Sequence, residues 1–334
     1  MPPPVSILLP AYNAERTLPA CLRSITRQRG GDWECVIVDD GSTDETLPIA
    51  QGFARKDPRF RILSESHAGL VAALNTGLAA CRGGLVARMD ADDLMHRERL
   101  QAQARALAEN AGLAAVGCHV RLFPRTALTE RFREYERWLN GIRTPDQLEA
   151  EAFVECPVAH PALMIRRETL AWAGYRDRGW PEDYDLVLRL LEGGHRIGMV
   201  ARRLLSWRDG PDRLWRRSPA YATERFVALK ASFLASGFLK DRDTYVLWGY
   251  GETGKALRRA LEAEGKRPGT IVELHPGRLG RKIHGAPVIP PEDLRGVSGR
   301  PIVVSVARAK ARGEIREILE GMGFRERTDF VCAA

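Results

Sequence analysis

Two groups of carboxylates in the sequence have the composition of a reaction centre. Asp90, Asp92 and Asp93 belong to the tetrapeptide DADD, and carboxylate oxygens are the ligands that hard divalent cations prefer. Such a cation can neutralise the charge that develops on a diphosphate as the bond to it breaks. Glu182 and Asp183 open the segment EDYDLVLRL, where a carboxylate could act as the base that takes a proton from a hydroxyl group.

Each group also has a structural interpretation. Asp93 could be the N-cap of the helix predicted from HRERLQAQ, which we weigh equally with a role as a metal ligand. Asp183 and Asp185 could be acids that simply favour the positive end of a helix. Extended backbone would place Asp90 and Asp92 on the same side, because side chains alternate along a strand.

Polar residues also follow the first two apolar strands. The first strand, VSILL, is predicted to end at Pro10, because proline has no amide hydrogen with which to continue a ladder. The loop after it carries Tyr12, which could stack on a nucleobase or pack against the protein. The second strand ends in Asp39 and Asp40, and one of these carboxylates could accept a hydrogen bond from an imide nitrogen of a base.

A parallel sheet would bring these residues together. VSILL, CVIVDD, FRILSES and GLVARMD are predicted strands, with helices from about residues 14, 44 and 70 between them, the second capped by Ser42 or Thr43. This alternation predicts a sheet covered by helices on both faces. Its carboxyl edge, where ligands bind in such folds, would comprise residues 10–13, 39–42, 64–67 and 90–93. Residues 123–156 are expected to be irregular, and ALMIRRETL and RIGMVARRLLSW to be strand-like.

A second alternation of strands and helices begins near residue 240. We therefore predict two domains, residues 1–239 and 240–334. In the second, GYGETG places Gly249, Gly251 and Gly254 between a strand and a helix, and Glu273 ends the next strand. This placement fits the dinucleotide fingerprint, so NAD(P) or another nucleotide is a candidate ligand. A purely structural or partner-docking role is the alternative.

Four segments follow one another along the chain: LLPAYNAERTLPACLRSI, CVIVDDGSTDET, ARMDADD and WPEDYDLVLRL. Together they resemble the inverting glycosyltransferases of family 2 over roughly residues 5–208. The resemblance implies the GT-A fold, an α/β nucleotide-diphospho-sugar transferase fold with a mostly parallel sheet flanked by helices. The C-terminal series adds a small Rossmann-like α/β domain. The resemblance also implies a nucleotide-sugar donor, Mg²⁺ or Mn²⁺, and a glycan, lipid-linked or protein acceptor.

The resemblance further implies roles for single residues. Asp183 matches the catalytic base and Asp92 the metal ligand, while Asp90 would contact the ribose or a metal-bound water. Asp39 would accept the hydrogen bond from the base, for which uracil is favoured. Further contacts to the donor are implied for the first loop, whose members are Pro10, Ala11, Tyr12, Asn13 and Glu15. For Asn13 a role as helix N-cap is the alternative.

Acceptor contacts are implied for His160 and Glu182, with packing as the alternative for His160. The sequence departs from the family where many relatives have a basic residue facing the diphosphate, because Leu74 precedes Asn75 there. The arginine-rich segment 202–217 could supply that charge, hold an anionic acceptor or touch an anionic membrane surface. A solvated basic loop is the alternative.

Charge and hydropathy argue against a nucleic-acid-binding protein and against a membrane-embedded one. The chain has 51 Lys+Arg and 43 Asp+Glu, a net charge of +8, and six arginines against two aspartates in residues 202–217 account for half of it. This distribution favours a diphosphate or anionic acceptor over nucleic acid. No apolar run approaches the roughly 18 residues of a membrane span, and the N-terminus lacks signal-peptide features. We expect a cytoplasmic protein, with peripheral membrane contact as an option, and six reduced cysteines.

The sequence thus predicts a metal-dependent inverting hexosyltransferase, acting on a nucleotide sugar, UDP-linked by preference, in surface polysaccharide or glycan biosynthesis. Two alternatives remain. One is a nucleotide-sugar-binding scaffold or sensor without turnover. The other is a sugar-phosphate nucleotidyltransferase, although the first loop lacks the glycine-rich phosphate loop that such enzymes normally have.

Overall fold

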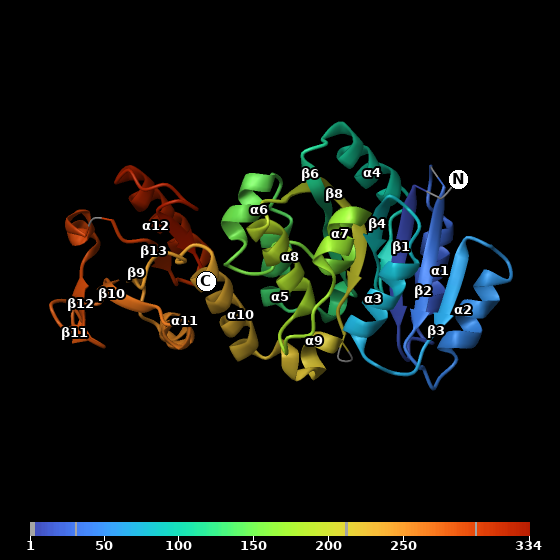
Figure 1. Cartoon of the computed structure of the whole chain (residues 1–334), viewed down its shortest axis with the longest axis horizontal. Coiled ribbons are helices and arrows are strands. Elements are labelled where there is room, and N and C mark those ends of the chain that lie inside the picture. Colours follow the sequence, from blue (N-terminus) through green and yellow to red (C-terminus); the bar gives the residue numbers. More distant parts are fainter. Residues whose placement is uncertain (1–3, 31, 211–212, 298) are drawn as a thin grey trace. The chain divides into compact units, whose positions relative to one another are not determined.

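The computed structural model describes residues 4–30, 32–210, 213–297 and 299–334. The chain forms two compact units (Figure 1). The first comprises Met1–Leu148, Val158–Arg178 and Glu182–Arg216, and the second Glu149–Pro157, Gly179–Pro181 and Arg217–Ala334. All six cysteines are buried thiols that form no disulfide bond among the described residues. Among the described residues, none of the helices combines the length and the apolar character of a bilayer-spanning segment.

The first unit is built on an eight-stranded sheet. Its strands are β1 (Val5–Ala11), β2 (Trp33–Asp39), β3 (Phe60–Ser64), β4 (Leu85–Arg88), β5 (Leu94–Met95), β6 (Leu113–Phe123), β7 (Met164–Arg166) and β8 (Arg196–Arg208). They lie in the order β3-β2-β1-β4-β7-β6-β8-β5. The first four strands are parallel, whereas β7 runs antiparallel to β4 and β6, and β5 antiparallel to β8.

Helices connect these strands. They are α1 (Leu18–Thr26), α2 (Thr46–Ala54), α3 (Leu70–Ala80), α4 (Arg99–Glu109), α5 (Glu130–Leu139), α6 (Pro145–Glu151), α7 (Arg167–Ala173), α8 (Glu182–Glu192) and α9 (Leu214–Arg217). The predicted alternation of the first four strands with helices is confirmed. Strands β1 and β2 are buried throughout, as expected for parallel strands covered on both faces.

The first strand continues past the predicted end at Pro10. Pro10 pairs with Val38 and Ala11 with Asp39 in the ladder with β2, and the amide of Asp40 donates to the Ala11 carbonyl (2.9 Å). The ladder with β4 pairs residues only as far as Leu8. Pro10 lies two residues further along, with its nitrogen on the β4 side, so its missing N–H interrupts only that ladder.

Residues 123–156 are more regular than the sequence suggested, because they contain α5 and α6. The hydroxyl of Thr129 accepts a hydrogen bond from the amide of Phe132 at the start of α5, and Glu130 supplies an acid in the first turn. These are ordinary helix-start signals. The segment ALMIRRETL is a strand only as far as Arg166, after which α7 begins.

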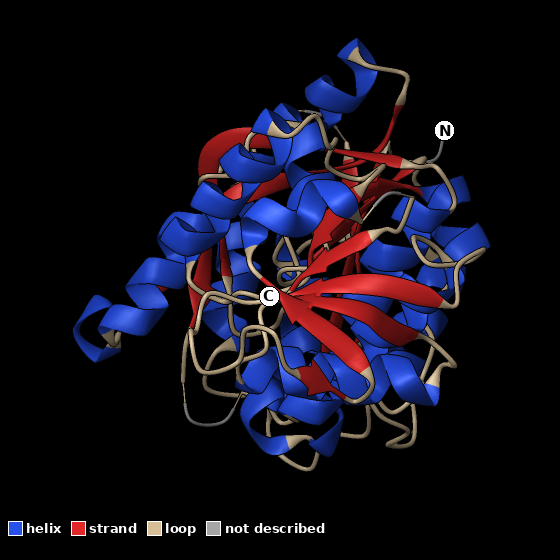
Figure 2. Ribbon diagram, turned by 90° about the vertical axis from the view of Figure 1, so that its left-hand side faces the viewer, coloured by secondary structure: helices blue, strands red, loops and turns tan. Residues whose placement is uncertain are grey.

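The second unit has a six-stranded sheet with the order β11-β12-β10-β9-β13-β14, visible as a twisted fan of strands in Figure 2. Among the described strand pairs of this sheet, only β11–β12 is antiparallel. The elements are α10 (Thr223–Ser236), β9 (Thr244–Trp248), α11 (Glu252–Ala263), β10 (Arg267–Val272), β11 (Lys282–Ile283), β12 (Ala286–Ile289), β13 (Ile302–Val304), α12 (Ala309–Gly321) and β14 (Phe330–Cys332).

The second unit begins at Arg217 and not near residue 240, because α10 packs into its core. Leu234 of α10 shares an apolar cluster with Leu247 of β9. The inserted segment 149–157 is held to this unit too: Lys230 donates to the carbonyl of Val154 (2.6 Å). Arg316 forms an ion pair with Glu151 (2.7 Å). Sequence position alone did not reveal these tertiary contacts.

Candidate active site

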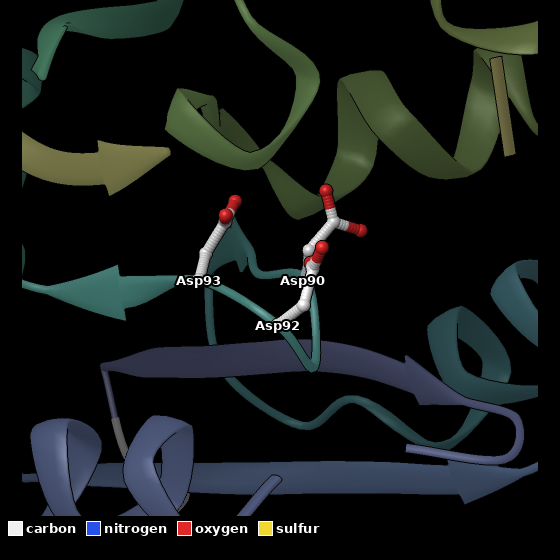
Figure 3. Close-up of side chains that lie close together, drawn as sticks. All are labelled: Asp90, Asp92 and Asp93. Carbon is white, nitrogen blue, oxygen red and sulfur yellow. The ribbon is translucent and has the colours of Figure 1, made fainter. Parts of the chain in front are cut away.

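Asp90, Asp92 and Asp93 lie in a tight turn between β4 and β5, which we call the acid turn. The amide of Asp93 donates to the Asp90 carbonyl (3.3 Å), so the backbone is not the extended strand end that we expected. One carboxylate oxygen from each residue lies within 4.8 Å of the others, and all three side chains project to the same side of the turn (Figure 3). The turn therefore gathers three carboxylates where strand alternation would have gathered two.

Asp93 does not cap a helix. Helix α4 starts at Arg99 with Glu98 at its N-cap position, whereas Asp93 is fully buried and accepts a hydrogen bond from the amide of Arg208 (2.7 Å). Burial and the Asp92 and Asp90 carboxylates raise its pKa well above the usual value. Its other oxygen, Oδ2, is buried without a partner among the described residues.

The arginine-rich segment meets the acid turn at two points. Arg208 donates from Nε to the carbonyl of Asp92 (2.7 Å). Burial and Asp90 raise the pKa of Asp92, while Arg213 lowers it. Arg213 is positioned by its contact with the ring of Trp207 (4.7 Å). Residues 211 and 212 and the side chains of residues 214 and 215 lie outside the described part of the segment.

Other arginines of this segment are engaged elsewhere. Arg202 forms an ion pair with Glu98, and Arg216 pairs with Asp209 (3.1 Å). In the described part of segment 202–217, the arginines that act on the acid turn are therefore Arg208 and Arg213.

Arg88 is a functional candidate that the sequence analysis missed. It is the last residue of β4, is buried, and forms an ion pair with Asp90. Burial would lower the pKa of its guanidinium, but the Asp90 carboxylate raises it, and the net pKa is raised. The available signal was a charged residue inside the otherwise apolar strand LVAR, since a buried charge needs a partner.

Asp183 lies in the first turn of α8 and is partly exposed. Burial raises its pKa to about 6, against the lowering effects of the Tyr184 amide and Arg88; that amide donates to its Oδ1 (2.8 Å). Asp185, two residues on, is buried and pairs with Arg189 (2.7 Å). Asp185 is therefore structural, and Asp183 is the better candidate for a base.

His160 and Glu182 lie near each other and are both buried, and Glu182 directly precedes the partly exposed Asp183. His160 Nε2 is 3.1 Å from the Tyr175 hydroxyl, and its Nδ1 is 3.8 Å from Glu182 Oε1. Burial, and secondarily Arg88, lowers the pKa of His160 well below its usual value, so the imidazole is neutral. Tyr175 was not predicted; its backbone exchanges two hydrogen bonds with the Asn75 side chain.

The two aspartates at the end of β2 have different environments. Asp40 accepts hydrogen bonds from the amides of Ala68 (2.8 Å) and Gly69 (3.0 Å), and its Oδ2 is 2.9 Å from His67 Nδ1. Asp39 is buried, accepts only a long bond from the Ser42 amide (3.3 Å), and its Oδ1 has no partner in the described chain. Asp40 thus stabilises the loop at residues 68–69, whereas Oδ1 of Asp39 remains available to accept a hydrogen bond.

An aromatic pair lies next to Asp40, because His67 contacts that carboxylate. The ring of Tyr12 stacks on that of His67, with centroids 4.1 Å apart and planes 19° from parallel. Tyr12 is 47% exposed, and a flat exposed ring can stack on a base. His67 follows β3, within the predicted carboxyl edge of the sheet, but the sequence predicts no role for it.

Asn13 and Glu15 connect the loop after β1 to the loop after β2 by hydrogen bonds. Asn13 has a positive φ of 47° and its Oδ1 accepts from the Thr43 amide (2.9 Å); Glu15 Oε2 accepts from the Glu45 amide (3.2 Å). Asn13 is therefore not a helix N-cap. Neither Ser42 nor Thr43 caps α2, whose N-cap position is Glu45. Pro10 and Ala11 are buried, so their side chains pack inside the protein and do not face a donor directly.

In the second unit the glycines meet the fingerprint's steric needs. Gly249 has a φ of 96°, and a Cβ at Gly254 would lie 2.2 Å from the Gly249 carbonyl oxygen. A Cβ at Gly251 would meet open space. Glu273 is already engaged, however, by Arg278 (2.7 Å) and by the amide of Leu274, so a ribose would have to share its carboxylate.

Known proteins resemble this chain over the unit that holds the acid turn. The model of the family described as Glycosyl transferase family 2 matches residues 6–172. EpsE of Bacillus subtilis, which is named as a glycosyltransferase, is 30% identical over 231 residues, or 67% of this chain and 80% of that protein. The amylovoran biosynthesis glycosyltransferase AmsE of Erwinia amylovora is 29% identical over 242 residues, or 70% and 88%.

Solved structures agree on the fold. S. aureus TarS 1–349 in complex with UDP-GlcNAc has a TM-score of 0.57 at 17% identity, covering 78% of this chain and 72% of that one. The mannosyltransferase PcManGT from Pyrobaculum calidifontis, in complex with GDP-Man and Mn²⁺, has a TM-score of 0.54 at 22% identity, covering 79% and 70%. The first unit has the GT-A fold, and the chain belongs to glycosyltransferase family 2.

Proposed function

We propose that this chain is a metal-dependent inverting glycosyltransferase that moves a sugar from a UDP-linked donor to an acceptor hydroxyl group. One observation carries the proposal: the acid turn and Asp183 interact with the same buried guanidinium. Arg88 forms an ion pair with Asp90 and lowers the pKa of Asp183. The acids suited to the diphosphate and to the acceptor proton thus share one electrostatic environment.

Asp183 is the proposed catalytic base. With a pKa raised to about 6 by burial, it is ionised at pH 7 and basic enough to accept a proton. The acceptor hydroxyl gives its proton to Asp183 while its oxygen bonds to the anomeric carbon. The bond from that carbon to the diphosphate oxygen breaks, and its electron pair leaves with the nucleoside diphosphate. Attack from the face opposite the leaving group inverts the anomeric centre.

The acid turn fits a divalent cation by the chemistry of its donors. It offers carboxylate oxygens within 4.8 Å of one another, and Asp93 contributes a buried oxygen without a described partner. Asp92, with Asp90 beside it, would hold the ion. When bound, Mg²⁺ or Mn²⁺ supplies positive charge to the diphosphate. Arg208 and Arg213 add charge at the same turn.

Asp39 is the proposed contact to the nucleobase. Its buried Oδ1 lacks a described partner, and a buried acceptor without a donor is costly. The imide N–H of uracil would satisfy it, with Tyr12 and His67 offering rings on which the base stacks. Asn13 and Glu15 would shape the loop that frames the donor. Because the PcManGT structure contains GDP-Man, GDP-linked donors belong in any test.

The acceptor side is proposed to be the buried cluster of His160, Tyr175 and Glu182, which would position the hydroxyl next to Asp183. AmsE is named for amylovoran biosynthesis, and we extend this setting, surface polysaccharide or glycan assembly, to the present chain. The acceptor would then be a growing glycan or a lipid-linked or protein-linked sugar.

For the second unit we propose nucleotide binding at Gly249, Gly251 and Gly254, with Arg278 as a cation close to a bound phosphate. Arg278 donates to the carbonyl of Tyr250 (3.0 Å) and pairs with Glu273, so it lies beside the glycine turn.

The test of the proposed function is binding of UDP by calorimetry with and without Mn²⁺. We expect Mn²⁺-dependent binding that Asp92→Ala abolishes. Glu109→Gln is the matched control, because Glu109 is an exposed acid of α4 paired with Arg105. Equal UDP affinity in the wild type and Asp92→Ala would contradict the assigned metal site.

A further inference from the structure

A basic cavity of about 600 Å³ opens in the first unit among α1, β5, β6 and β8. Five arginines line it, and none of the described residues that line it is acidic. We call these residues the arginine rim: Arg23, Arg27, Arg97, Arg121 and Arg203. None of them belongs to the site proposed for donor or acceptor.

Four of the five arginines of the rim have no acidic partner in the part of the chain that the structure describes. Within the described residues, Arg23, Arg27, Arg121 and Arg203 have no carboxylate at ion-pair distance, and Arg97 has only Glu98 at 4.0 Å. Some exposed arginines elsewhere in this unit do have acidic partners. Arg105 pairs with Glu109, and Arg137 pairs with Glu130.

The cavity combines this charge with an apolar floor. Met95 and Leu205 are 4% and 1% exposed and belong to neighbouring strands, because Met95 of β5 pairs with Leu205 of β8. All five rim arginines are exposed. The volume is in the range of small-molecule sites, about 300–1,000 Å³. Guanidinium groups match the geometry of phosphate oxygens and bind them by paired hydrogen bonds.

We propose that the arginine rim is a binding site for a phosphate-bearing ligand, separate from the donor site. The phosphate is held by guanidinium groups of the rim, and the uncharged part of the ligand covers Met95 and Leu205. Strand β5 begins directly after Asp93, so the ligand would contact the strand that follows the acid turn. The phosphate belongs either to a lipid headgroup or to a soluble molecule.

The test measures binding of inorganic pyrophosphate to the full chain by calorimetry in EDTA, which excludes binding through a metal at the acid turn. The rim variant is Arg121→Gln/Arg203→Gln. The matched control is Arg105→Gln/Arg137→Gln, which removes the same charge from paired surface arginines. We expect the control to bind as the wild type does and the rim variant to bind at least about tenfold more weakly, since bonds to charged groups are strong.

A second arm identifies the source of the phosphate. Co-sedimentation compares vesicles of phosphatidylglycerol in phosphatidylcholine with vesicles of phosphatidylcholine alone. Binding to the anionic vesicles that the rim variant loses assigns the site to a lipid headgroup. Pyrophosphate binding without vesicle binding assigns it to a soluble phosphate. Failure of the wild type to bind in either arm, or equal losses in the rim variant and the control, would overturn the proposal, whatever the outcome for UDP and Mn²⁺.

Discussion

Adjacent aspartates of like sequence context have different hydrogen-bond environments in this protein. Asp40 satisfies the amides of Ala68 and Gly69, whereas Asp39 keeps a buried oxygen without a described partner. The sequence predicts that one of the pair faces a base, and only family resemblance singled out Asp39. The hydrogen bonds of the folded loop now supply a physical reason for that choice.

This difference predicts separable effects of two substitutions. Asp39→Ala should weaken UDP binding about 10- to 100-fold, the value of one hydrogen bond to a charged group, with little loss of stability. Asp40→Ala should lower the free energy of unfolding by about 1–3 kcal/mol for each amide left unsatisfied. Calorimetry with UDP and urea denaturation measure the two effects. A large stability loss in Asp39→Ala would show that its spare oxygen has a structural partner after all.

The pKa of Asp183 predicts the pH profile of the reaction. Only the ionised carboxylate can accept a proton, and burial raises its pKa to about 6. The value of kcat/KM for the acceptor should therefore fall about tenfold per pH unit below pH 6 and level off above it.

Asp183→Asn should lower kcat by about 10² to 10⁴ on the plateau above pH 6 and remove the fall below it. Asp185→Asn is the comparison at a neighbouring acid and should act on stability, because Asp185 pairs with buried Arg189. A profile that is unchanged in Asp183→Asn would assign the base to another group.

At the residue scale the sequence singles out most acids of the proposed site but not their geometry. The DADD motif was found, yet the turn that brings Asp93 in with Asp90 depends on the Arg208 amide, far away in sequence. Arg88, His67 and Tyr175 were missed because their importance comes from contacts between elements. A charge inside a buried strand was the one local sign of Arg88.

At the scale of elements, α3 packs closely against β1 and β2, the strands whose carboxyl ends carry the loops of the proposed site. A Cβ at Gly77 of α3 would lie 2.3 Å from Leu8 Cδ1 and 2.8 Å from Val38 Cγ2. Glycine thus allows close packing where the helix crosses β1 and β2, although glycine is a poor helix former by about 1 kcal/mol.

Two helix glycines should therefore respond oppositely to alanine. Gly77→Ala should destabilise the protein by roughly 1–2 kcal/mol, since overpacking costs about 1–3 kcal/mol and the helix gains back up to about 1. Gly52→Ala in α2, where a Cβ meets only Arg55 Nη2 at 3.8 Å, should stabilise it by about 0.5–1 kcal/mol. Urea denaturation of both variants is the measurement. Stabilisation by Gly77→Ala would mean that α3 can move away from the sheet.

Elements with strong periodicity were predictable, and irregular ones were not. The strands β1 to β4 follow from apolar runs, since both faces of a parallel sheet are covered. Helix α5 was missed although Thr129 caps it, because its charged sequence hides the apolar stripe. The prediction that the first strand ends at Pro10 is wrong, because a proline blocks a ladder on only one side of its strand.

At the scale of the whole molecule, sequence predicted two α/β parts but not how the chain divides between them. The segment 149–157 and helix α10 belong to the second unit through packing and through Lys230 and Arg316. Such assignments depend on long-range contacts that no local pattern encodes.

Metal binding should change the stability of the whole protein in a pH-dependent way. Burial and mutual repulsion raise the pKa values of Asp92 and Asp93, so protons compete with a cation at higher pH than at ordinary aspartates. Mn²⁺ at 100 times its Kd should stabilise the fold by about 2.7 kcal/mol at neutral pH, and this gain should shrink as the pH falls. Thermal melts with Mn²⁺ or EDTA across pH 5–8 measure it. A gain that Asp92→Ala retains would place the metal elsewhere.

The central claim is that the acid turn and Asp183 together transfer a sugar from a nucleotide donor. The most direct measurement is release of nucleoside diphosphate from a panel of UDP- and GDP-linked sugars, with and without Mn²⁺, by the wild type, Asp92→Ala and Asp183→Asn. We predict release from a UDP-linked sugar that requires Mn²⁺ and is reduced at least about 10²-fold in both variants. Release by both variants at the wild-type rate, or no release from any donor with Mn²⁺ and a broad set of acceptors, would contradict the claim.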